Sequence, residues 1–125
     1  MSISRKFLLI GCTYLLIGML FGMYMGGSGD HTFAPLHAHI NLLGFVLPAI
    51  YAVVYHVFPA MTGGLLTKAH FWLHSVGTFV VLIMLYLFLS GKISETAMVP
   101  LAPISELMIL VATAIFGWNV IKNVA

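Results

Sequence analysis

The chain has 125 residues, of which 62% are hydrophobic and 6% are charged, and its mean hydropathy is +1.11. Soluble domains carry about 25% charged residues, so this composition excludes a soluble protein and indicates an integral membrane protein. The formal net charge of +2 is too small to indicate a nucleic-acid partner. The single cysteine, Cys12, excludes an internal disulfide.

Four mostly apolar segments are long enough to cross a membrane, at about residues 7–25, 35–58, 69–90 and 98–120. Each holds about 20 residues, the length that a helix needs to span a hydrocarbon layer of about 30 Å. The connections between them are short, so neighbouring helices must run antiparallel. We therefore expect one all-α transmembrane domain over residues 1–125, an up-down-up-down four-helix bundle surrounded by membrane lipid.

The basic residues indicate how the helices are oriented. Lys92 lies on one side of the membrane, and the other four basic residues lie on the opposite side: Arg5, Lys6, Lys68 and Lys122. Lysine and arginine concentrate on the cytoplasmic side of membrane proteins. The pattern predicts a multi-pass protein of a bacterial inner (cytoplasmic) membrane with both termini in the cytoplasm.

Two features of the first segment leave alternatives open. Leu9-Ile10-Gly11-Cys12 is similar to a lipoprotein cleavage box, but only about five apolar residues precede the cysteine, against about 7–15 in a signal core. We expect a retained helix, with lipidation of Cys12 as the alternative.

The spacing of Gly18 and Gly22 favours close approach of another helix; the alternative is that a membrane helix merely tolerates the two glycines.

The second segment carries two histidines, His37 and His39, inside its apolar run. An ionisable side chain in lipid is costly and usually has a partner and a function. Residues at i and i+2 of a helix point about 200° apart, so the two imidazoles aim at two sites rather than at one small metal ion. Farther along, Pro48 cannot donate to the carbonyl of Gly44, which predicts a kink or a widened turn.

With both termini in the cytoplasm, His37 and His39 are expected near the outer, non-cytoplasmic face. This outer pair of histidines suits an iron porphyrin, because haem iron takes one axial imidazole on each face of the ring. We expect haem b at His37 and His39, with Asn41, Gly44 and Phe45 as further cofactor-binding residues. The aromatic side chains available to line the slot are Phe33, Phe45, Tyr24 and Tyr51. The alternative is that each histidine only forms a hydrogen bond to a neighbouring helix.

The other ionisable residues fall into two groups by their distance along the helices. His39 and His56 are about 25 Å apart at 1.5 Å per residue, so His56 belongs with His70 and His74 near the cytoplasmic side. His70 and His74 share a helix face, and with His56 they are a possible second metal site; the favoured alternative is hydrated interfacial histidines. Glu106 lies in the outer half as a proton-relay or ligand-supporting group, or as a neutral hydrogen-bonded acid.

The methionines support a rival function, because thioethers suit Cu(I). Met19, Met23 and Met25 end the first segment near His31, which fits a copper-binding or accessory membrane protein without haem. A third possibility is a purely structural subunit. The sequence contains no phosphate loop, no Ser/His/Asp order and no paired carboxylates, and we expect no catalytic residues.

The run Pro35-Leu-His-Ala-His-Ile-Asn-Leu-Leu-Gly-Phe-Val, with Tyr55-His-Val-Phe-Pro59 after it, resembles a ligand-bearing helix in the catalytic subunit of haem–copper oxidases and nitric-oxide reductases. The likeness covers residues 35–59. In that family a His-x-His helix gives one histidine to each of two haems, so the resemblance implies that His37 and His39 each bind a haem iron.

The family's subunit is larger, with three arcs of four helices each, whereas this chain corresponds to one arc. The resemblance and the His-x-His geometry together imply a homotrimer, in which His37 of one protomer and His39 of the next share a haem b. The chain lacks the adjacent histidine pair of the family's copper-site helices, and two axial imidazoles leave the iron no open position. We expect electron transfer, or redox or gas sensing, rather than a complete oxidase, with a redox partner that the sequence leaves open.

Overall fold

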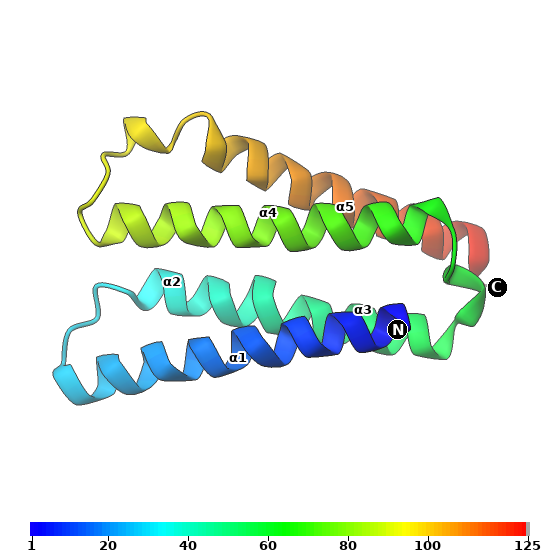
Figure 1. Ribbon diagram of the computed structural model, residues 1–125, viewed down its shortest axis with the longest axis horizontal. Helices are drawn as coiled ribbons and strands as arrows, with labels where there is room; N and C mark the ends of the chain where they lie inside the picture. Colours follow the sequence, from blue (N-terminus) through cyan, green and yellow to red (C-terminus); the bar gives the residue numbers. More distant parts are fainter. Residues whose placement is uncertain (125) are drawn as a thin grey trace.

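The computed structural model describes residues 1–124 and contains four long helical segments (Figure 1). They are α1 (Ile3–Ser28), a continuous segment made of α2 (Ala34–His39), the π-helix η1 (Ile40–Val46) and α3 (Leu47–Val57), then α4 (Leu65–Leu89) and α5 (Leu101–Asn123). Two short 3-10 turns, η2 (Pro59–Met61) and η3 (Thr96–Met98), lie in the connections. The predicted all-helical, antiparallel four-helix fold is confirmed.

All four segments are long and apolar enough to cross a membrane, so the protein is a multi-pass membrane protein. α1 extends beyond the predicted residues 7–25 at both ends and α4 begins before residue 69, whereas α5 begins only at Leu101, after the predicted start at residue 98. Ser2 caps α1 by accepting a hydrogen bond from the amide of Arg5 at 3.3 Å. Gly29 ends α1 in the left-handed conformation at φ 72°, where its amide donates to the carbonyl of Met25.

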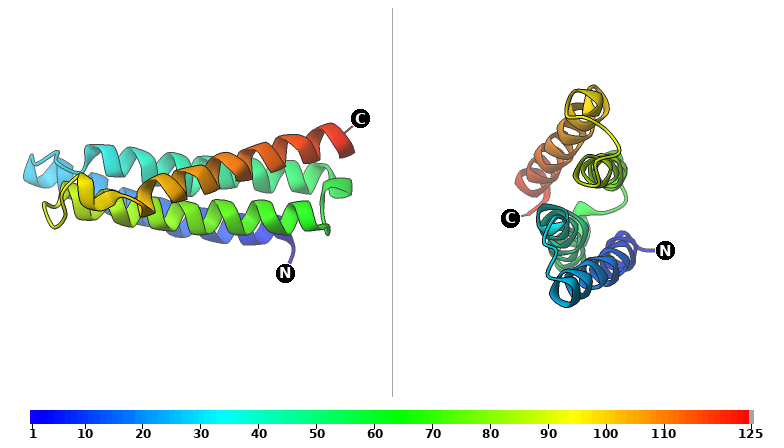
Figure 2. Two further views of the ribbon diagram at one scale, coloured as in Figure 1. Left: turned by 90° about the horizontal axis from the view of Figure 1, so that it is seen from above. Right: turned by 90° about the vertical axis from the view of Figure 1, so that its left-hand side faces the viewer.

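The helices form two hairpins that lie side by side (Figures 1 and 2). In the first hairpin α1 packs along α2, η1 and α3, and in the second α4 packs along α5. In the end view on the right of Figure 2, the helices follow one another in a row, with α1 and α5 at its opposite ends. We call the end with residues 2, 57–65 and 124 the terminal end, and the end with the connections 29–33 and 90–100 the distal end.

Each hairpin is closed by glycines that let two helix backbones approach. A Cβ on Gly77 of α4 would lie 2.9 Å from the carbonyl oxygen of Ser105 on α5. In the first hairpin, a Cβ on Gly18 would collide with the side chain of Asn41, and one on Gly22 would lie 3.1 Å from Cε1 of His37. The predicted close approach at Gly18 and Gly22 is therefore confirmed.

The π-helix η1 is the widened turn that Pro48 predicts. The amide of Leu47 donates to the carbonyl of Leu42, five residues back, and Pro48 has no amide with which to resume the ladder at Gly44. The backbone therefore becomes α-helical again only in α3. This turn rotates α2 and its two histidines relative to α3.

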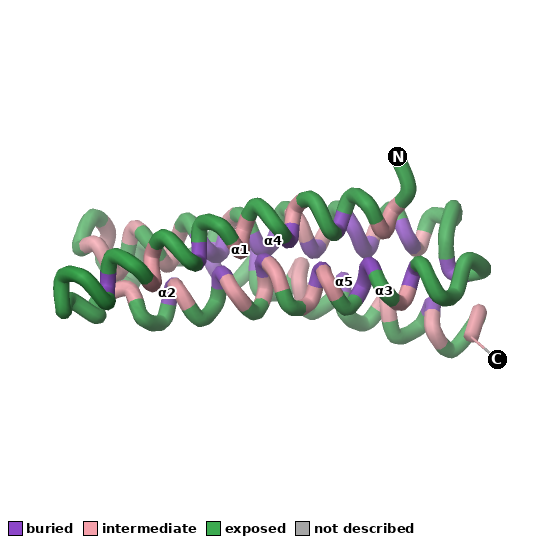
Figure 3. Tube along the Cα trace, turned by 90° about the horizontal axis from the view of Figure 1, so that it is seen from below, coloured by how far each residue is buried: buried purple, intermediate pink, exposed green. Residues whose placement is uncertain are grey.

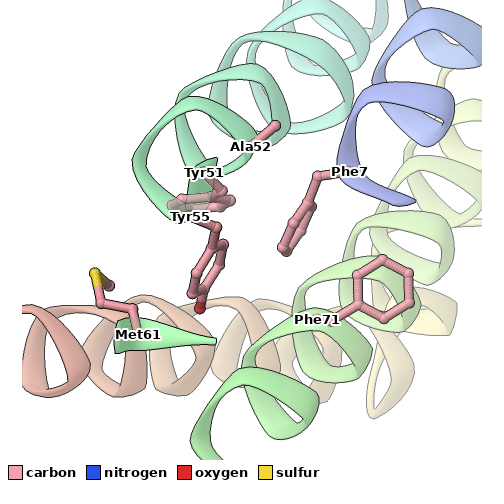
Figure 4. Packing of buried hydrophobic residues seen from close by; sticks show 6 residues of the cluster. All are labelled: Phe7, Tyr51, Ala52, Tyr55, Met61 and Phe71. Carbon is pink, nitrogen blue, oxygen red and sulfur yellow. The ribbon is translucent and has the colours of Figure 1, made fainter. Parts of the chain in front are cut away.

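Buried residues follow a narrow inner stripe of the helices (Figure 3). Many large apolar side chains are exposed on the outside. The larger core lies at the terminal end, where buried apolar and aromatic residues of both hairpins and of η2 meet (Figure 4): Phe7, Tyr51, Ala52, Tyr55, Met61 and Phe71. A second core near the distal end contains Leu36, Ile40, Val81 and Leu82. An apolar exterior around an apolar core is what a lipid environment permits.

Candidate functional site

The connection before α2 is ordered by its own polar side chains. The amide and the hydroxyl of Thr32 both donate to Oδ1 of Asp30, at 2.9 and 2.6 Å, and these bonds lower the pKa of Asp30. The ring of His31 donates from Nδ1 to the carbonyl of Gly29 at 3.0 Å. This compact turn leads directly into α2, which has Pro35 in its first turn, and so places the histidine helix at the distal end.

His37 points toward α1 and has both ring nitrogens engaged. Nδ1 donates to the carbonyl of Gly18 at 2.8 Å; because a carbonyl only accepts, the proton of the neutral ring is on Nδ1. Nε2 accepts from Nδ2 of Asn41 at 3.3 Å, which is beyond the usual range for such a bond. The glycine at position 22 leaves room for the ring.

His39 points away from the rest of the chain. Its Nδ1 donates to the carbonyl of Pro35 at 2.7 Å and the side chain is exposed. Its Nε2 is therefore the nitrogen that can accept or ligate. The predicted divergence of the two histidines is confirmed: His37 faces α1, and His39 faces outward.

The other residues expected around a cofactor pack within the first hairpin. Asn41 binds His37, as above. The ring of Tyr14 lies over Gly44, where a Cβ would sit 2.6 Å from the Cβ of Tyr14. Phe45 contacts Gly11, with 3.5 Å between Cδ2 and a Cβ at that glycine. Gly44 and Phe45 thus help to join η1 to α1 and leave no slot for a ring between them.

The four aromatic residues expected in one slot lie in different places. Tyr24 and Phe33 border a distal cavity of about 310 Å³, together with Phe21 and Tyr86. Tyr51 lies in the terminal core, with its ring centroid 4.3 Å from that of His70. The expectation that Tyr51 lines a slot with the outer histidines is therefore wrong, because it is several helical turns from His37.

The second group of histidines does not form a three-ligand centre. His56 is exposed, whereas His70 and His74 are buried. Among residues 1–124, no group of three or more His, Cys, Asp or Glu side chains is arranged to hold a metal ion.

His70 and His74 instead connect the two hairpins. Nδ1 of His70 lies 2.8 Å from the hydroxyl of Tyr55 on α3, and Nε2 of His74 donates to the carbonyl of Leu43 in η1 at 2.9 Å. The remaining nitrogens, Nε2 of His70 and Nδ1 of His74, have no hydrogen-bond partner. Aromatic rings of Phe7, Tyr51 and Phe116 surround the pair.

The residues of the copper hypothesis point in different directions. Met19 and Met23 are exposed, at 55% and 71%, whereas Met25 is buried at 6%. Glu106 is exposed on α5, and α5 packs mainly against α4. No hydrogen bond joins Glu106 to the outer histidines within the part of the chain that the structure describes.

Sequence reasoning missed one polar contact that shapes the terminal end. Asn119 of α5 is buried, and its Nδ2 donates to the carbonyl of Met61 at 3.0 Å. The hydroxyl of Thr67 donates to the same carbonyl at 2.6 Å. The available signal was an amide side chain inside the apolar run of the fourth segment, a residue type that needs a partner in a membrane.

In comparisons with known proteins, no family model, no curated protein and no solved structure matched this chain.

Proposed function

We propose that the protein is a membrane b-type cytochrome that binds haem b between protomers, through His37 and His39. The observation that carries this proposal is shared by the two histidines: each gives its Nδ1 proton to a backbone carbonyl. Ligating histidines typically donate their other ring nitrogen to such a group, because this fixes the tautomer and directs Nε2 to the metal. Both rings therefore have the tautomer of a ligating histidine: Nε2 of His39 is free, and Nε2 of His37 is only weakly engaged by Asn41.

The placement of the residues favours a haem bound between chains. Gly44 and Phe45 are packed against α1, so a flat macrocycle must approach from outside the hairpin. His39 is exposed on the outside of the hairpin, on the same helical segment as the exposed apolar side chains of Leu42 and Val46. An imidazole facing lipid is costly, and a neighbouring protomer with a haem would cover it. A homotrimer is the assembly that the resemblance to the oxidase subunit suggests.

Ligation by His37 requires Asn41 to release Nε2. Their 3.3 Å contact is long, and a neutral hydrogen bond contributes about 0.5–1.5 kcal/mol, which an iron–imidazole bond readily replaces. The Gly18 carbonyl keeps the ring orientation when Asn41 moves.

The bound haem would supply one-electron chemistry. If His37 and His39 both held the iron, electron transfer, or redox or gas sensing through a labile ligand, would fit better than oxygen reduction. The placement of four basic residues at the terminal end favours a bacterial inner-membrane protein with cytoplasmic termini.

The first test is the visible spectrum of the detergent-purified protein, oxidised and dithionite-reduced, with a pyridine haemochrome assay. We expect a low-spin b-type spectrum that is lost in His37→Ala and in His39→Ala and kept in His56→Ala, whose histidine lies at the other end of the same helical segment. Absence of a Soret band after expression with ample haem contradicts the proposal and leaves the copper and structural alternatives.

Sharing between protomers has its own test. His37→Ala and His39→Ala chains with different tags are co-expressed, and oligomers that carry both tags are isolated. An interface between an intact His37 and an intact His39 then forms again, so haem should return to the mixed oligomers. If haem is bound within one chain, the mixed oligomers stay colourless.

A further inference from the structure

A cavity of about 560 Å³ opens at the terminal end, where the first turns of α1 and α4 meet the connection after α3. Its wall includes Lys6 from α1 and Lys68 from α4, and no carboxylate. Lys6 reaches toward α4, with Nζ 5.6 Å from the ring centroid of Phe71, one turn after Lys68. The two hairpins therefore each contribute a cation to one cavity.

No acidic side chain is near enough to neutralise these cations. The chain has three acidic residues, and all belong to the distal half: Asp30 and Glu95 lie in the distal connections, and Glu106 lies in the second turn of α5. Within residues 1–124, no acidic side chain therefore compensates the positive charge of the cavity.

The cavity also contains backbone donors that no side chain satisfies. Gly64 precedes α4 and offers no side-chain cap to the first amides of that helix, which lack intrahelical acceptors. Gly63 has φ 85°, a conformation that favours glycine, and a Cβ on either glycine would meet no heavy atom within 4 Å. Open amides at a helix start favour an anion, particularly beside two lysines.

We propose that this cavity binds the phosphate group of an anionic phospholipid. Lys6 and Lys68 flank the apolar spans, so the cavity lies at the level of the lipid headgroups, and basic pockets between transmembrane helices bind such headgroups. Its volume is within the range of about 300–1,000 Å³ that is typical of ligand sites. Apolar wall residues such as Ile3 and Pro59 suit the glycerol and acyl portions of a lipid better than a free phosphate.

A bound lipid would have a structural consequence, because the cavity lies between the hairpins. α1 and α4 contact each other only sparsely, whereas the contacts within each hairpin are extensive. A phosphate held by Lys6 and Lys68 would connect the two. Ligands that bind only the folded state raise its stability.

The test compares thermal unfolding of the full chain in a neutral detergent with added phosphatidylglycerol or phosphatidylcholine of equal acyl chains. We expect a larger rise in Tm with phosphatidylglycerol, and its preferential retention in native mass spectrometry of the wild-type protein. Lys6→Gln/Lys68→Gln should abolish the difference between the lipids. The control Arg5→Gln/Lys122→Gln removes equal charge at the same end but outside the cavity, and should retain the difference.

Three results would overturn the proposal. Equal effects of the two lipids on the wild-type protein would mean that the cavity does not recognise an anion. A difference retained by the cavity variant, or lost equally in the control, would assign the effect to general surface charge. The same Tm rise with glycerol phosphate, which has no acyl chains, would identify a soluble anion as the ligand.

Discussion

The hydroxyl of Tyr55 lies 2.8 Å from Nδ1 of His70, and this pair joins α3 of the first hairpin to α4 of the second. Both side chains are buried, at 1% and 0% exposure. A buried polar group that loses its partner costs about 1–3 kcal/mol, whereas a satisfied pair is only mildly stabilising. The pair is therefore a place where single substitutions should be more harmful than their combination.

We predict that Tyr55→Phe lowers the free energy of unfolding by about 1–3 kcal/mol. The ring stays and keeps its packing on Phe7 and Phe116, but both nitrogens of His70 are then without partners. Tyr24→Phe, at an exposed tyrosine, should have no such effect. In a double-mutant cycle measured by denaturant unfolding in detergent, Tyr55→Phe/His70→Leu should cost less than the sum of the single changes. Additive costs would mean that the hydrogen bond does not couple the hairpins.

The contact between α1 and η1 leads to a second prediction, at Gly18. Gly18→Ala places a methyl group against the side chain of Asn41, and overpacking of this kind costs about 1–3 kcal/mol. Gly26→Ala is the matched control, because it is in the same helix and its Cβ meets nothing within 4 Å; it should be neutral or stabilise by about 0.5–1 kcal/mol. Thermal unfolding compares the two variants, and we expect a lower Tm for Gly18→Ala than for Gly26→Ala. Equal Tm values would rule out the tight helix contact at Gly18.

Much of the fold follows from composition and spacing alone. Length and hydropathy predict the four spans, and short connections predict their antiparallel order. Pro48, which has no amide to donate, predicts the widened turn that is observed as η1. The divergence of His37 and His39 follows from helix geometry, whichever neighbours the helix has.

The partners of the polar side chains did not follow from the sequence. The hydrogen bonds from His37 to Gly18 and between Tyr55 and His70 depend on how each helix is rotated about its axis and shifted along it. In soluble proteins an amphipathic pattern reveals that rotation, but here both the core and the lipid-facing surface are apolar. The assignment of Tyr51 to the outer site failed for a simpler reason: aromatic residue type alone does not give depth in the membrane.

A third prediction concerns Asn41 and rests on the proposed haem ligation. Asn41→Ala removes the donor that occupies Nε2 of His37, so the haem-free protein should lose about 1 kcal/mol of stability. Haem stoichiometry should remain that of the wild type, because the Gly18 carbonyl still orients the ring. Stability is measured on haem-depleted protein, and stoichiometry by the pyridine haemochrome assay. Loss of haem as complete as in His37→Ala would show that Asn41 is required for haem binding.

The carbonyl of Met61 receives hydrogen bonds from Asn119 on α5 and Thr67 on α4, and so fixes the connection between the hairpins. We predict that Asn119→Ala speeds amide exchange in residues 58–64 about tenfold, which corresponds to ~1.4 kcal/mol of lost local stability. Hydrogen–deuterium exchange with mass spectrometry reports this region separately from the helices. Thr113→Ala is the control, since its hydroxyl donates to the carbonyl of Ile109 within α5 and makes no contact with the carbonyl of Met61. Unchanged exchange in Asn119→Ala would mean that Thr67 alone holds the turn, and that α5 could separate from the terminal end without loosening it.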